Sequence, residues 1–115
     1  MRLSTTTSIL SKKSETPRKT AVFRALAHCK KAGFSHVELD LLAQAKEGDP
    51  LALDGWEAWA DQLRSYAEQL GISMYQGHSF VYRTKESTDL KLPNRAWYEE
   101  RIVRSILIAG RVGIQ

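Results

Sequence analysis

The chain has 115 residues and a net charge of +4, with 43% apolar and 26% charged residues, a balance typical of one globular domain. No apolar run approaches the roughly 20 residues of a membrane-spanning helix. We expect no secretory signal, because no apolar h-region follows the first arginine. Cys29 is the only cysteine and cannot form an internal disulfide, so we expect it to pack as a small apolar group in a cytoplasmic protein.

A first strand is predicted over residues 3–10, which are rich in β-branched side chains. Its threonines suit a strand that borders a polar pocket better than one inside an apolar core. A helix is expected to start near Thr16-Pro17, because proline tolerates the first helical position. Apolar residues then recur at helical spacing as far as Ala32, and His28 lies on the opposite, solvent-facing side.

A second strand is predicted over residues 34–41, followed by a polar connection over 43–53. Asp54 and Glu57 have the spacing of a capping box, so a second helix is expected to begin there. Its apolar stripe consists of residues at helical spacing: Trp56, Trp59, Leu63, Ala67 and Leu70. The two indoles in this stripe are either core side chains, which is the commoner use, or a platform for a ligand.

A third strand is predicted over residues 72–77, and the loop over 79–93 is long enough to suggest a functional role. Asn94 is a suitable cap for a third helix. We expect the inner side of this helix to carry Trp97, Ile102, Ile106 and Ala109, with Val103 and Leu107 broadening it.

Three glycines close these helices at nearly equal intervals: Gly33, Gly71 and Gly110. Glycine readily takes the left-handed conformation that ends a helix. A regular repeat of helix, glycine and strand is typical of stacked βα units with a parallel sheet. The predicted fold is therefore α/β in the order βαβαβα, and because the sequence stops where a fourth strand would begin, we expect part of a larger fold.

Ligands of parallel α/β proteins bind beyond the carboxyl ends of the strands. Thr7 and Ser8 offer hydroxyls at the end of the first strand. In the second strand, period-two alternation places Glu38 and Asp40 on one face. Two carboxylates on the inner face of a parallel strand are costly to desolvate, so a polar pocket explains them better than a dry core. An ion pair, or a cap for the following loop, is the alternative.

The end of the third strand carries Gly77 and His78, where glycine allows a close approach of the backbone to a ligand. An imidazole at this place can bind metal, hydrogen-bond a hydroxyl or carry a proton, but a structural role is about as common. Tyr82, Arg83 and Lys85 in the next loop would contact an anionic or sugar-like ligand, or only solvent. No phosphate-binding glycine loop, nucleophile elbow or zinc-ligand spacing is present.

Positive charge is concentrated in residues 1–31, which hold eight lysines and arginines and one acid, Glu15. Such a segment is found in transit peptides and in arms that bind nucleic acid. The plainer interpretation is a solvated loop and helix face, because the first strand lies within the same segment.

Four segments resemble the start of the xylose-isomerase-like TIM barrels: residues 2–10 (RLSTTTSIL), 29–39 (CKKAGFSHVEL), 66–72 (YAEQLGI) and 77–79 (GHS). This superfamily holds sugar isomerases, sugar-phosphate isomerase/epimerases, inosose dehydratases and the endonuclease IV class of DNA-repair enzymes. The resemblance implies that residues 1–115 are the N-terminal part of a (β/α)8 barrel, with about three βα units. Ser79 replaces a proline that is frequent in the family.

The resemblance implies that Glu38 and His78 line a substrate pocket, with Asp40 and Ser8 beside them, and that His78 is a candidate metal ligand. The divalent ion (Mn, Mg, Co or Zn) would be held mainly by Glu, Asp and His residues of later strands. The implied function is a metal-dependent sugar or sugar-phosphate isomerase/epimerase-like protein, with this chain inactive alone. The alternatives are a phosphodiesterase acting on damaged DNA, and a non-catalytic truncated barrel that self-associates or docks with a missing C-terminal portion.

Overall fold

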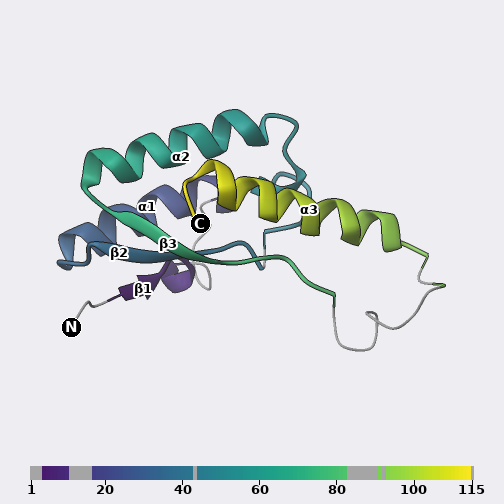
Figure 1. Ribbon diagram of the computed structural model, residues 1–115, viewed down its shortest axis with the longest axis horizontal. Helices are drawn as coiled ribbons and strands as arrows, with labels where there is room; N and C mark the ends of the chain where they lie inside the picture. Colours follow the sequence, from purple (N-terminus) through teal and green to yellow (C-terminus); the bar gives the residue numbers. More distant parts are fainter. Residues whose placement is uncertain (1–3, 11–16, 43, 83–90, 92, 115) are drawn as a thin grey trace.

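A parallel sheet forms the centre of the molecule. The computed structural model describes residues 4–10, 17–42, 44–82, 91 and 93–114. Strands β1 (Ser4–Thr6), β2 (His36–Asp40) and β3 (Ser73–His78) pair in parallel in the order β1-β2-β3. Helices α1 (Arg18–Lys31), α2 (Trp56–Leu70) and α3 (Arg95–Arg111) alternate with them and gather on one side of the strands (Figure 1). The predicted α/β class and element order are confirmed.

The apolar core lies between the helices and one face of the sheet. Val37 and Leu39 of β2 point into it and are fully buried. All three helices contribute to the same cluster: Val22, Leu26 and Cys29 from α1, Trp59, Ala60, Leu63 and Ala67 from α2, and Ile108 from α3. The indole of Trp59 is a core side chain that donates to the carbonyl of Lys19 at 2.9 Å. Burial raises the pKa of the Cys29 thiol, as expected of a packing residue.

The first strand is shorter than the prediction over 3–10, because the chain turns into a 3-10 helix, η1 (Thr7–Leu10). The turn is stabilised by the buried hydroxyl of Thr7, which accepts the backbone N–H of Asp40 at 2.9 Å. A side chain thereby replaces the next ladder bond of the strand. A second short 3-10 helix, η2 (Pro50–Ala52), lies in the connection between β2 and α2.

The helix ends agree only in part with the predicted signals. Gly33 and Gly71 have φ angles of 92° and 68°, as expected where a helix ends. Gly110 does not end α3, which continues to Arg111, and the glycine with positive φ is Gly113 at 96°. The capping box is also wrong, since α2 follows Gly55 without a side-chain cap and Glu57 instead pairs with Arg111 at 3.2 Å.

The predicted inner side of α3 is right only in part, since Ile102 and Ala109 are partly buried but most of the other predicted residues are exposed. Ile106 is 60% exposed, Val103 53% and Leu107 51%, whereas Ser105 and Ile108 are buried. Two arginines set this orientation. The guanidinium of Arg104 donates to the carbonyl of Leu51 at 2.8 Å, and that of Arg101 donates to the carbonyl of Ala45 at 3.3 Å. A periodicity analysis counts arginine as polar, so it misses arginines whose aliphatic parts cover the core.

An ion-pair cluster joins the end of α3 to α2. The guanidinium of Arg111 donates to both oxygens of Asp61, at 2.7 and 2.9 Å. This pairing lowers the pKa of the Asp61 carboxyl and raises that of Arg111.

Among the described helices, none has the length and apolar character to cross a membrane.

Truncation of the core should be costly. Leu63 is fully buried, so Leu63→Ala is expected to lower the free energy of unfolding by about 2–5 kcal/mol, measured by urea denaturation. Leu42→Ala is the matched control, because Leu42 is 46% exposed, and should change stability by less than about 0.5 kcal/mol. Equal effects of the two substitutions would contradict the placement of the core.

The Asp61 pair should make stability depend on pH. Its depressed folded-state pKa means that the stabilisation is present above the ordinary carboxyl pKa of 3.8 and is lost as pH falls further. Asp61→Asn should therefore lower the melting temperature slightly at neutral pH and have no effect at the acid end of the titration. Added salt should shrink the difference, because the pair is exposed. Glu47→Gln, a substitution at an exposed residue, is the control and should leave the melting temperature unchanged.

Candidate functional site

The face of the sheet opposite the helices is polar. Residues paired in register share a face, and Glu38 lies beside Thr6 of β1 while Asp40 lies beside His78 of β3. These side chains alternate with the buried apolar residues of β2. Parallel sheets are usually covered by apolar contacts on both faces. The polar second face is therefore the candidate ligand-binding side of the sheet.

Glu38 and His78, predicted as site residues, contact each other across neighbouring strands. Oε1 of Glu38 is paired with Nε2 of His78, and their side chains are 20% and 55% exposed. The contact requires a proton on Nε2, which Glu38 accepts in a hydrogen bond or an ion pair. A ligand would therefore meet the other ring nitrogen, Nδ1, together with the second carboxylate oxygen of Glu38.

Asp40 has a structural task. Its carboxylate Oδ1 accepts the backbone N–H of Leu42 at 2.9 Å and so closes the turn after β2. The side chain of Gln44 donates to the backbone carbonyl of Asp40 from the same connection. The cap, which was the alternative explanation of this acid, is thus observed, and Asp40 borders the candidate site mainly as a support.

Ser8 is brought to the same edge by the turn that ends β1. Its hydroxyl lies 3.3 Å from Oγ1 of Thr6, and its backbone N–H donates to that same oxygen. Thr6 is the register partner of Glu38. The hydroxyls of Thr6 and Ser8 therefore lie next to the Glu38–His78 pair at the carboxyl end of the sheet.

Tyr75 and His36 extend the polar face toward the amino ends of the strands. The Tyr75 hydroxyl lies 3.0 Å from the hydroxyl of Ser4, across the whole sheet, and its ring is 6.1 Å from that of His36. No sequence pattern pointed to these residues. Tyr75 is the extra residue of a β-bulge between Met74 and Gln76, and a bulge interrupts the alternation from which faces are predicted.

Gly77 does not leave room for a ligand. A Cβ atom at this position would lie 3.2 Å from Cδ1 of Ile114, so the space is filled by the end of the chain. An adjoining pocket of about 170 Å³ opens on the helix side, and its lining is largely apolar: Leu41, Gly77, His78, Ser79, Ser105, Ile106, Ala109 and Ile114. The expected role of Gly77 in ligand approach is replaced by packing against Ile114.

The segment after β3 is held by aromatic contacts. Tyr82 stacks on Tyr98 at a centroid distance of 5.1 Å, and Phe80 lies 5.7 Å from Trp97. The guanidinium of Arg95 lies 5.4 Å from the Tyr82 ring. Tyr82 is therefore engaged with α3, and partial burial raises the pKa of its hydroxyl. Arg83 and Lys85, the predicted anion contacts of this loop, lie outside the described residues.

No set of three or more His, Cys, Asp or Glu side chains that could hold a metal ion occurs within the described ranges. Glu38 and His78 supply two donors, which is fewer than a resident divalent ion needs. The described residues therefore do not fit the implied ion by themselves.

Comparison of the chain with protein-family models, with curated proteins and with solved structures returns no match. The resemblance to the xylose-isomerase-like barrels is carried by residues 2–10, 29–39, 66–72 and 77–79.

The hydroxyl of Thr7 should be important for the edge of the site. Thr7→Val keeps the shape of the side chain but leaves the partly buried N–H of Asp40 without this acceptor. A loss of about 1–3 kcal/mol in the free energy of unfolding is expected from urea denaturation. Thr5→Val is the control, because Thr5 is only partly buried in the preceding strand, and it should change stability little. Equal losses for both variants would remove the special role of Thr7.

Proposed function

We propose that the Glu38–His78 pair binds a polyhydroxylated ligand, a sugar or sugar phosphate, within a sheet of the (β/α)8-barrel type. The observation that carries this proposal is the contact of an acid and an imidazole from neighbouring parallel strands on the polar face of the sheet. Parallel strands in chain order with all helices on one side are compatible with a barrel segment, in which the uncovered polar face would form the interior.

The chemistry of the pair suits hydroxyl recognition. The Glu38 carboxylate has lone pairs beyond those used by His78, and it accepts hydroxyl hydrogens of a sugar. His78 offers Nδ1, which accepts a hydroxyl hydrogen when the ring is neutral and donates when it is charged. The hydroxyls of Thr6 and Ser8, adjacent along the same edge, both donate and accept. Such a set matches the alternating donors and acceptors of a carbohydrate.

Glu38 and His78 would bind the ligand in this chain, without a proton transfer or a metal-dependent step. The resemblance places the ligands of a divalent ion on strands later than β3, and the described residues contribute two donors at most. Isomerase or epimerase activity is proposed only for a completed barrel.

A binding titration tests the proposal directly. The purified chain would be titrated with a ketose, its phosphate ester and a carboxylic acid of similar size without hydroxyls, by calorimetry and by NMR of the His78 ring. Sugars should bind, and His78→Gln and Glu38→Gln should each weaken binding by about tenfold or more, as loss of hydrogen bonds to a charged group predicts. The matched controls His28→Gln and Glu47→Gln change exposed residues elsewhere and should bind as the parent does.

Two results would contradict the proposal. The first is a folded parent chain, verified by circular dichroism, that binds none of the sugars. The second is sugar binding that both site variants retain. Tight binding of abasic DNA that falls steeply with added salt would instead favour the phosphodiesterase alternative.

A further inference from the structure

The β-bulge determines what β3 presents on the polar face of the sheet. Tyr75 is the extra residue between Met74 and Gln76, so the alternation of the strand is interrupted there. Gln76 is the register partner of Glu38, and Tyr75 reaches across the same face to β1. Two consecutive residues thus share the polar face with His78. Bulges are frequent beside active sites, where they redirect side chains.

The ring of Tyr75 is exposed but held in place. Tyr75 is 43% exposed. Its hydroxyl donates to that of Ser4 on β1 at 3.0 Å, so the side chain crosses over β2. The imidazole of His36 lies edge-on to the ring at a centroid distance of 6.1 Å and is itself hydrogen-bonded to the Ser35 hydroxyl at 2.9 Å. An anchored ring loses little conformational freedom when a ligand packs on it.

Tyr75 and the Glu38–His78 pair belong to one continuous surface. His36, beside Tyr75, is two residues from Glu38 on β2, which corresponds to roughly 7 Å along the strand. Gln76 lies between Tyr75 and His78, and its exposed amide group both donates and accepts hydrogen bonds. A ligand bound by the pair therefore reaches the ring of Tyr75 when it extends toward the amino ends of the strands.

An exposed aromatic ring next to an amide suits a sugar ring. The faces of a sugar ring carry C–H groups, which pack on the large rigid surface of an aromatic ring. Its rim carries hydroxyls, which exchange hydrogen bonds with an amide. Tyr75 would contact the face of such a ring, and Gln76 would contact its rim.

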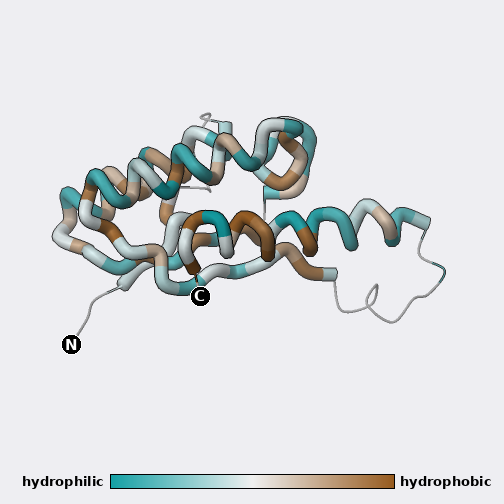
Figure 2. The backbone as a smooth tube through the Cα atoms, turned by 45° about the horizontal axis from the view of Figure 1, so that its top comes forward, coloured by the Kyte–Doolittle hydropathy of each residue, from teal (hydrophilic) through white to brown (hydrophobic). Residues whose placement is uncertain are grey.

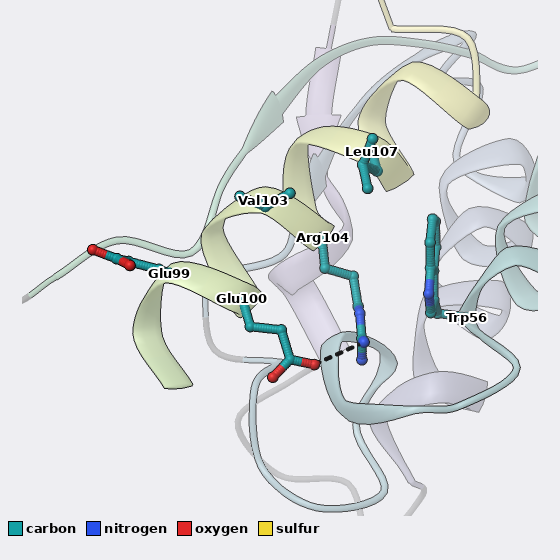
Figure 3. Close-up of a pocket in the computed structure, with 6 residues that line it drawn as sticks. All are labelled: Trp56, Glu99, Glu100, Val103, Arg104 and Leu107. Atoms are coloured by element: carbon teal, nitrogen blue, oxygen red, sulfur yellow. Dashed lines mark hydrogen bonds and ion pairs between the residues drawn. The ribbon is translucent and has the colours of Figure 1, made fainter. Parts of the chain in front are cut away.

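The outer surface of α2 and α3 is of a different kind. Figure 2 shows a hydrophobic stretch in the C-terminal half of α3. A hollow of about 330 Å³ between α3 and the start of α2 is lined by Trp56, Glu99, Glu100, Val103, Arg104 and Leu107. Its carboxylates are paired within the chain, since Arg104 donates to Glu100 at 2.9 Å (Figure 3) and Arg95 lies 3.0 Å from Glu99. The polar face of the sheet therefore suits a saccharide better than this hollow.

We propose that Tyr75 and Gln76 form a second sugar subsite, and that the ligand of the polar face is a disaccharide or a longer saccharide. One ring is bound by Glu38 and His78, and the next ring packs on Tyr75. The second subsite rests on the proposed function, because it extends the ligand that Glu38 and His78 bind.

Calorimetric titration of the whole chain with matched sugars tests the second subsite. Glucose and xylose would be compared with cellobiose, maltose and xylobiose, which repeat the same rings. At least one disaccharide should bind about tenfold more tightly than its own monosaccharide, and Tyr75→Ala should remove that gain while monosaccharide binding stays unchanged. Leu107→Ala is the control, because Leu107 is 51% exposed but lies on α3, and it should keep the gain.

Tyr75→Phe separates packing on the ring from the anchoring hydrogen bond. It keeps the ring and removes only the bond to Ser4, so most of the gain should remain. Monosaccharides that bind as tightly as every disaccharide overturn the second subsite and leave the proposed function standing. A disaccharide gain that Tyr75→Ala retains overturns the second subsite as well. A folded chain that binds none of these sugars contradicts the proposed function and the second subsite together.

Discussion

The alternation of β2 is the constraint on which the rest of the structure depends. Val37 and Leu39 face the helices and are buried, so Glu38 and Asp40 necessarily face the other way. One-residue slippage would bury two carboxylates and expose two core side chains, a change that costs several kcal/mol. Burial of the core thus determines where the polar residues lie, and the candidate site follows from the hydrophobic effect without any further interaction.

A second constraint comes from hydrogen bonds between arginines and backbone carbonyls. Arg101 and Arg104 attach α3 to the connection between β2 and α2. These bonds satisfy carbonyls of an irregular segment that has no ladder partner. The aliphatic parts of the two arginine side chains cover apolar surface. Because α3 is oriented in this way, Val103, Ile106 and Leu107 are left exposed to solvent. The side of α3 that faces the rest of the molecule is thus held partly by hydrogen bonds of arginines, where apolar contacts would be expected.

Much of the architecture could be predicted from the sequence, because it depends on local signals. The parallel order follows from helix–glycine–strand repeats, and Gly33 and Gly71 have the conformation expected of them. The placement of Glu38 and His78 on neighbouring strands also follows from the sequence, but their direct contact does not.

The predictions that were wrong concern features set by contacts between residues far apart in the sequence. The partner of Glu57 is Arg111, far along the chain, so no local pattern predicts that the capping box is not used. The orientation of α3 likewise depends on distant carbonyls, and the position of Tyr75 could not be predicted from period-two alternation because of the bulge in β3.

The same bulge has an evolutionary consequence. Since Tyr75 is one residue more than the ladder needs, gain or loss of a single codon at this point would leave the pairing of Gln76, Gly77 and His78 with β2 intact. The two ends of the sheet are therefore free to change in length and in composition separately.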